Sequence, residues 1–143
     1  MEELGHLIKL RHEKLQYLRG QGIAPYINRF KIDTVIKSLV DNFALESKEE
    51  LEEKNHTCIA AGRIMTRRKH GKTTFVNIQD STGQIQVFIN KNALGEEAYE
   101  LFGKFDIGDI IGVEGRVSKT KTGELTLFAT KTTLLSKSLF YSS

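Results

Sequence analysis

The sequence has few of the residues that build cysteine-based or metal-based sites. Cys58 is the single cysteine of 143 residues, so neither a disulfide nor a zinc site made of several thiolates can form within the chain. Its setting in an apolar run predicts a buried, inert thiol. The histidines lie at positions 6, 12, 56 and 70 without the spacing of a metal site or a catalytic triad, and no carboxylate cluster suits a metal. The sequence therefore argues against catalysis by this chain alone, including nuclease chemistry.

Long apolar runs are also missing. No stretch approaches the length that spans a bilayer, and the first residues, Met-Glu-Glu-Leu-Gly-His, lack a basic region followed by an apolar one. We expect a soluble, cytoplasmic protein with no membrane partner. A chain that is 39% hydrophobic and 27% charged is long enough for one core and short for two.

Positive charge is concentrated in the second half of the chain. The formal net charge is only +3, but six basic residues face a single acid, Asp80, between positions 62 and 92. From position 116 onward, five basic residues face only Glu124, while acids gather between Glu46 and Glu53. Basic patches suit a polyanion, although a charged face alone favours nucleic acid only weakly.

Helical spacing dominates the first third of the sequence. Apolar residues from Leu4 to Leu18 predict an amphipathic helix, and a second helix is expected over 34–42, capped by Asp33. A third helix is expected to begin at Ser47, whose spacing to Glu50 matches a capping box.

Alternating patterns follow from His56 onward. The expected order is a strand over 57–66, a basic turn over 67–71, strands over 72–79 and 84–90, a helix over 92–104, and strands over 109–118 and 124–135. Five strands with a helix between the third and fourth predict a Greek-key OB-fold barrel behind a helical extension. The expected divisions are a helical extension at 1–54, the barrel at 55–139 and a tail at 140–143. The expected interior residues of the last two strands are Ile111, Val113, Val117, Leu125, Leu127 and Ala129.

The second and third expected strands have unlike faces. One face carries only aliphatic residues, whereas the other places Phe75 and Phe88 among Asn and Gln side chains. Aromatic rings stack on any base, and amides both donate and accept at base edges, so this face is typical of a surface for unpaired bases. For a single Phe, a ring covered by a neighbouring loop is the simpler interpretation.

The same alternation places Glu124, Thr126 and Phe128 outward on the last strand. A carboxylate repels phosphate, so Glu124 on a basic surface makes sense if it accepts hydrogen bonds from a base. The alternative is an ordinary ion pair with Lys121 or Arg116.

Several motifs resemble the N-terminal anticodon-binding domain of class II lysyl-tRNA synthetases, over nearly the whole chain. They are Arg11-x-x-Lys14-Leu15-x-x-Leu18-Arg19, Ala61-Gly62-Arg63-Ile64-Met65-Thr66-Arg67-Arg68 with Gly71-Lys72, Phe75-Val76 with Gln79-Asp80, Gly83-x-Ile85-Gln86, Gly108-Asp109-Ile110 and Lys119-Thr-Lys-Thr-Gly-Glu124-Leu125.

The resemblance implies a barrel that holds the uridine-rich anticodon of tRNA-Lys. Phe75 would stack on the central uridine, Gln86 and Glu124 would hydrogen-bond anticodon bases, Arg68 would lie beside them, and Phe88 is a weaker stacking candidate. From the basic patches we add candidates for phosphate contacts: Arg63, Arg67, Lys69, Lys72, Lys119 and Lys121.

One departure from the family is large. The parent family is an ATP-dependent lysine-tRNA ligase that continues into a catalytic domain, whereas this sequence ends at Ser143. We therefore expect no enzyme activity, no ATP or magnesium site and no other metal site here, and a monomer or weak dimer. The leading hypothesis is a module that binds the tRNA-Lys anticodon stem-loop; the alternative is an OB protein that binds single-stranded nucleic acid in general.

Overall fold

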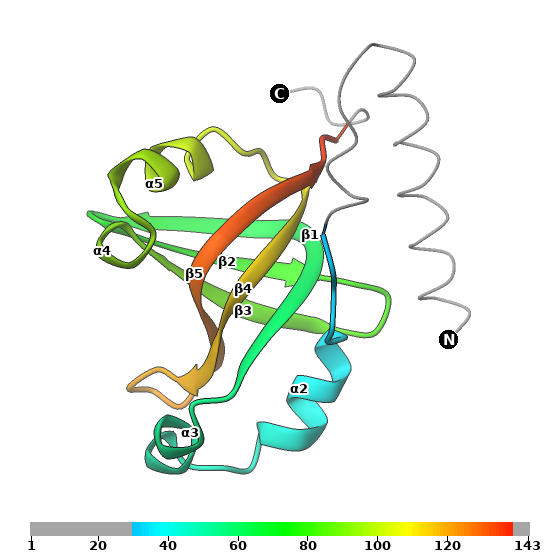
Figure 1. The fold of residues 1–143 in the computed structure, drawn as a ribbon, viewed down its shortest axis with the longest axis vertical. Helices are drawn as coiled ribbons and strands as arrows, with labels where there is room; N and C mark the ends of the chain where they lie inside the picture. The colour runs from blue at the N-terminus through cyan, green and yellow to red at the C-terminus, as the bar shows by residue number, and fades with distance from the viewer. Residues whose placement is uncertain (1–29, 139–143) are drawn as a thin grey trace.

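A computed structural model describes residues 30–138 (Figure 1). The helix expected near the N-terminus, with its basic residues, and the tail at 140–143 lie outside this range. The helices are α2 (Ile36–Phe43), α3 (Lys48–Lys54), α4 (Lys91–Leu94) and α5 (Glu96–Phe102). The strands are β1 (Thr57–His70), β2 (Thr73–Gln79), β3 (Gln84–Asn90), β4 (Ile110–Lys119) and β5 (Leu125–Ser136). Within residues 30–138, no helix is both long enough and apolar enough to cross a bilayer.

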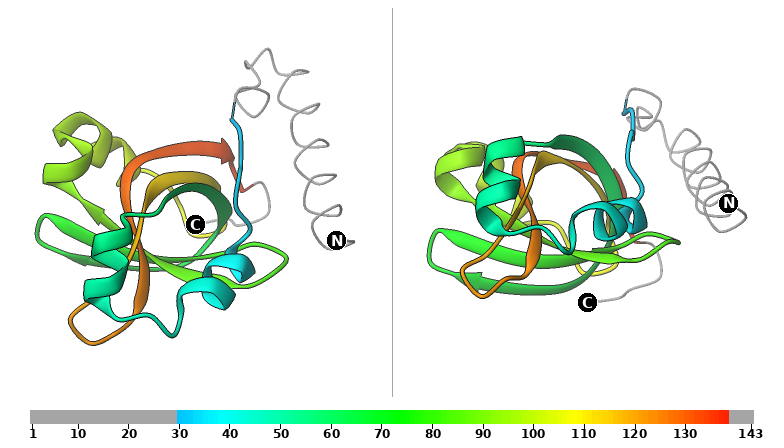
Figure 2. Two further views of the ribbon diagram at one scale, coloured as in Figure 1. Left: turned by 60° about the horizontal axis from the view of Figure 1, so that its bottom comes forward. Right: turned by 90° about the horizontal axis from the view of Figure 1, so that it is seen from below.

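The five strands close into a barrel in the order β1-β2-β3-β5-β4 (Figure 2). Neighbouring strands are antiparallel, except that β3 and β5 run parallel. In Figure 1, α4 and α5 lie at one end of the barrel and α2 and α3 at the other. The predicted OB-fold architecture, with helices before β1 and between β3 and β4, is confirmed.

Alternation along the strands produces the core as predicted. The aliphatic face of β2 and β3, from Val76 to Ile89, is buried in one continuous cluster. The expected interior residues of β4 and β5 join this cluster, although Leu125 is only partly buried. Cys58 is buried there too, and this burial raises the pKa of its thiol to about 11, which keeps the sulfur protonated and unreactive.

β1 is longer than its sequence indicated. A basic turn was expected over 67–71, but pairing with β2 continues from Arg67 opposite Val76 to His70 opposite Thr73. The register of the β1–β2 pairing shifts at an irregularity between Ile64 and Thr66, and the pairing continues beyond it. The turn itself is confined to Gly71 and Lys72, and Gly71 has a positive φ of 61°.

The prediction of a single helix over 92–104 was wrong, because two short helices occupy this segment. Gly95 separates them with a φ of 94°, a backbone conformation that ends α4 and starts α5. The side chain of Asn90 caps α4 by accepting a hydrogen bond from Asn92 N–H at 2.7 Å.

Of the two caps predicted for α2 and α3, one is confirmed and the other is wrong. Ser47 and Glu50 form the predicted capping box, and the Ser47 backbone N–H lowers the pKa of Glu50 below its usual range. The predicted Asp33 cap of α2 was wrong, because that helix begins after Val35. Asp33 instead accepts a hydrogen bond from Ile59 N–H at 2.8 Å, which is also the main reason its pKa is lowered.

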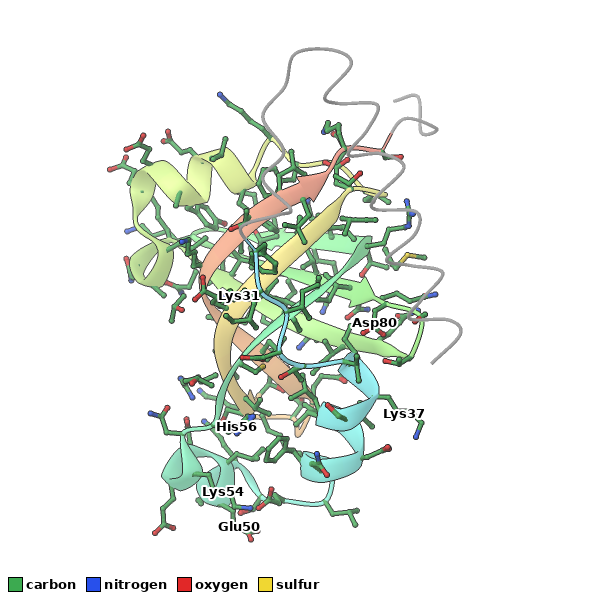
Figure 3. The ribbon with its side chains drawn as sticks, turned by 45° about the vertical axis from the view of Figure 1, so that its right-hand side comes forward. Lys31, Lys37, Glu50, Lys54, His56 and Asp80 are labelled. Atoms are coloured by element: carbon green, nitrogen blue, oxygen red, sulfur yellow. The ribbon has the colours of Figure 1, made fainter. Side chains whose placement is uncertain are left out.

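Asp80 joins α2 to the barrel. Its carboxylate is buried and accepts hydrogen bonds from the backbone N–H groups of Ile36, Thr82 and Gly83, at 2.9, 2.8 and 3.0 Å, and from the Thr82 hydroxyl at 2.6 Å. One side chain thus shapes the β2–β3 turn and holds the first turn of α2 (Figure 3). Lys37 directly follows Ile36 in α2, and its side chain points away from the barrel in the same view.

We expect Asp80→Ala to lower the free energy of unfolding by about 2 kcal/mol or more, because it leaves several buried donors without an acceptor. Urea unfolding followed by circular dichroism measures the change. Asp41→Ala is the control, since the exposed Lys37–Asp41 pair should contribute less than about 0.5 kcal/mol. Equal effects of both substitutions would contradict this role of Asp80.

Candidate nucleic-acid interface

Strand pairing places five residues side by side across the outer face of the barrel, one from each strand. Arg68 of β1 lies opposite Phe75 of β2, which lies opposite Phe88 of β3. The parallel β3–β5 pairing sets Phe88 beside Phe128, and Phe128 lies opposite Arg116 of β4. We call these five residues the aromatic row.

The rings of the aromatic row are in contact and its ends are cationic. Ring centroids lie 5.2 Å apart for Phe75 and Phe88 and 5.2 Å apart for Phe88 and Phe128. The guanidinium of Arg68 lies 5.5 Å from the centroid of Phe75, and that of Arg116 lies 4.8 Å from the centroid of Phe128. Each ring is half-buried, so every one keeps an accessible surface on which a base can stack.

Gln86 lies next to the aromatic row and its amide is oriented by two neighbours. Its Nε2 donates to Thr126 Oγ1 at 3.0 Å, and its Oε1 accepts a long hydrogen bond from Arg68 Nη2 at 3.4 Å. An amide has two N–H donors and two acceptor lone pairs, so one donor and one acceptor position stay available to a base edge. Two predicted anticodon-binding residues, Arg68 and Gln86, are thus in contact.

Thr126 lies on the same outer face as Phe128, as expected, because it pairs with Gln86 as Phe128 pairs with Phe88, but it is fully buried. Its hydroxyl accepts from Gln86 and donates to the Glu124 carbonyl at 2.9 Å, and across the ladder it faces Ser118, which is also buried. Thr126 therefore supports Gln86 from beneath rather than presenting its own side chain to solvent.

Glu124 lies in the β4–β5 turn, directly before β5, and is exposed. Its backbone is anchored, since Glu124 N–H donates to Thr120 Oγ1 at 3.2 Å and Thr120 N–H donates to the Glu124 carbonyl at 3.0 Å. No cation among residues 30–138 forms an ion pair with its carboxylate, so the expected alternative partners, Lys121 and Arg116, do not engage it. The turn is fixed while the carboxylate stays available.

A groove of about 460 Å³ runs along the aromatic row, with α3 as one wall and the β4–β5 turn as the other. Lys48 and Glu52 of α3 line it, together with the three Phe rings, Arg116 and residues 119–122. The Arg116–Glu52 ion pair joins β4 to α3, and Lys119 Nζ donates to the Ala44 carbonyl at 2.7 Å. We call this the aromatic groove.

The sequence analysis did not name six lining residues of the aromatic groove as site residues: Lys48, Glu52, Arg116, Thr120, Thr122 and Phe128. The outward position of Phe128 was recognised, and its aromatic character was the available signal. Its place beside Phe88 depends on the parallel pairing of β3 with β5, which a local pattern does not encode.

The residues predicted to contact phosphate lie in different parts of the structure. Lys119 and Lys121 line the aromatic groove, whereas Lys69 and Lys72 line a separate hollow beside α5. Arg63 donates to the Gly108 carbonyl at 2.8 Å. Arg67 donates to the Phe105 carbonyl and lies over the Phe102 ring, on the opposite face of β1 from Arg68.

Comparison with known proteins agrees with this geometry. A family model described as an OB-fold nucleic acid binding domain matches residues 59–135. The chain belongs to this family. All five residues of the aromatic row of this OB-fold nucleic acid binding domain, from Arg68 to Phe128, lie within the matched range.

Relatives of this OB-fold domain include lysine–tRNA ligases. The ligase of Pelotomaculum thermopropionicum is 49% identical over 138 residues, covering 96% of this chain and 26% of that protein. Those of Bacillus cytotoxicus and Bacillus thuringiensis are 50% and 49% identical over 138 residues, again 96% of this chain, and 28% of each relative. The resemblance inferred from the motifs is confirmed, and the chain spans about a quarter of the length of these relatives.

Gly115 sets the spacing between β4 and β5 at the aromatic row. A Cβ at this position would collide with the carbonyl oxygen of Phe128, which is backbone and cannot rotate away. We expect Gly115→Ala to lower the free energy of unfolding by about 1–3 kcal/mol, measured by thermal or urea unfolding. Gly83→Ala is the control, because its Cβ would make an ordinary contact with Ile36 at 3.7 Å. A neutral Gly115→Ala would contradict the proposed constraint.

Proposed function

We propose that this chain binds the uridine-rich anticodon of tRNA-Lys along the aromatic groove. The observation that carries the proposal is the aromatic row, with three contacting rings between two guanidinium groups. Such a platform stacks successive bases of a single strand, at about 1–3 kcal/mol per base, while flanking cations attract the phosphates. The similarity to lysine–tRNA ligases supports the choice of RNA.

The polar groups beside the row supply a means of base discrimination. Phe75 stacks on the central uridine, and Gln86, held by Arg68 and Thr126, offers it one donor and one acceptor. The Glu124 carboxylate accepts hydrogen bonds only, so it favours a base edge that donates, such as N3–H of uridine, over the unprotonated N3 of cytidine. Lys119 and Lys121 line the same groove, where their charges would attract the phosphates of the RNA.

General binding of single-stranded nucleic acid is the competing function, because aromatic stacking does not distinguish one base from another. In that case Glu124 would only repel phosphate. The effect of neutralising Glu124 therefore separates the two functions.

We expect the 143-residue chain to prefer a tRNA-Lys anticodon stem-loop over the same hairpin with its central uridine changed to cytidine, in fluorescence anisotropy at fixed moderate salt. Phe75→Ala should weaken binding by about 5-fold to 150-fold, the equivalent of one lost stacking contact. Glu124→Gln should reduce the preference for uridine while leaving the fold intact, since the side chain is exposed.

Glu53→Gln is the matched control, because it removes an exposed carboxylate of α3 that does not line the aromatic groove. It should leave the preference unchanged. Equal affinity for both hairpins, together with tighter binding by Glu124→Gln, would replace anticodon recognition with general, charge-driven binding.

A further inference from the structure

A second hollow, of about 520 Å³, lies between the β1–β2 hairpin and α5. Its charged lining residues are Arg67, Lys69, Lys72, Lys91 and Lys104, with Glu100 as the one acid. Two of these cations come from β1, and the others come from the β1–β2 turn, α4 and the segment after α5. We call this hollow the basic groove.

The basic groove and the aromatic row lie on opposite faces of the same hairpin. Arg67 pairs with buried Val76 and Lys69 with buried Thr74, whereas Arg68, between them, pairs with Phe75. Successive residues of a strand point to opposite sides, so Arg67 and Lys69 point away from the rings. A nucleic-acid strand stacked on the aromatic row therefore does not occupy the basic groove.

Most of the positive charge in the basic groove has no internal partner. Within residues 30–138, the side chains of Lys69, Lys72 and Lys104 form no ion pair or hydrogen bond, and Lys91 has only a distant pairing with Glu96, at 3.7 Å. The Nε of Arg67 is buried and finds no hydrogen-bond acceptor in the same part of the chain. Buried N–H groups are nearly always satisfied in folded proteins, so the unsatisfied Nε leaves the guanidinium charge only partly compensated by its hydrogen bond to the Phe105 carbonyl.

The floor of the basic groove does not offer a surface for bases. Tyr99 is 8% exposed and its hydroxyl shares a 2.8 Å hydrogen bond with Thr74, while Phe102 is 1% exposed and lies beneath Arg67. Convergent cations without an accessible ring select for charge and not for base identity.

We propose that the basic groove is a second anion site that binds phosphate groups independently of the aromatic row. The phosphates come either from the backbone of an RNA or from a free oligophosphate, because both present the same oxygens to the lysines. The site goes beyond anticodon recognition and stands whether or not the aromatic groove discriminates uridine.

The first test uses inorganic tripolyphosphate and the 143-residue chain, followed through backbone amide shifts in NMR spectra. We expect saturable shifts around Lys69–Thr74 and Gly103–Lys104, with the amides of Phe88 and Phe128 unaffected. Lys69→Gln with Lys104→Gln should weaken this binding by about tenfold or more, since both residues are exposed and each loses a charge-assisted contact.

Lys31→Gln with Lys131→Gln is the matched control, because it removes the same charge from exposed positions outside both grooves. It should leave tripolyphosphate affinity unchanged. Equal weakening by the two double variants, or shifts centred on the aromatic row, would show diffuse attraction and overturn the proposal.

The second test identifies the source of the phosphate through the salt dependence of anticodon stem-loop binding. If RNA backbone occupies the basic groove, the Lys69/Lys104 double variant should lower the slope of log affinity against log salt by about one per lysine. If the slope stays unchanged while tripolyphosphate binding is lost, the site serves a free oligophosphate. This variant should still discriminate uridine from cytidine. A failure of anticodon recognition can therefore be distinguished from a failure of phosphate binding in the basic groove.

Discussion

The parallel pairing of β3 with β5 closes the barrel, and the candidate interface depends on it. Without this pairing, Phe75 and Phe88 would form an isolated aromatic pair on a hairpin, and Phe128 and Arg116 would lie on a different sheet edge. Closure also removes the exposed edges of the sheet, where unpaired backbone groups would recruit other chains. The same pairing that completes the fold therefore completes the row of rings.

The helices before β1 are part of this construction. Ile36, Leu39 and Leu51 are buried in the same cluster as the barrel interior, and Asp80 holds α2 through backbone hydrogen bonds. On the other side, the Arg116–Glu52 pair ties α3 to β4, and the Lys119–Ala44 contact ties the C-terminal end of α2 to the end of the same strand. The wall of the aromatic groove is thus held by the core as well as by surface charge.

Sequence patterns correctly predicted the structural features that depend on residues close together in the sequence. Alternation separated Val76 and Ile78 from Phe75, and the spacing of Ser47 and Glu50 identified a cap, because both features repeat within a few residues. The errors arose where a distant partner decides. Asp33 was expected to cap a helix, but its acceptor is used by Ile59. Thr126 points outward as expected, yet it is buried because β3 and β4 enclose it. Arg67 and Arg68 are adjacent and chemically identical, so only the register of β1 shows that one supports the fold and the other faces the rings.

Arg68 and Phe128 belong to strands at opposite ends of the barrel sequence, which has a consequence for how the protein forms. Contacts between distant segments form late in folding, because the intervening chain must first be ordered. A nascent chain whose β5 is still inside the ribosome lacks the third ring, so Arg116 of β4 has no Phe128 to pack against. An RNA that stacks on the full row binds the native state alone, and by mass action it stabilises the closed barrel against unfolding.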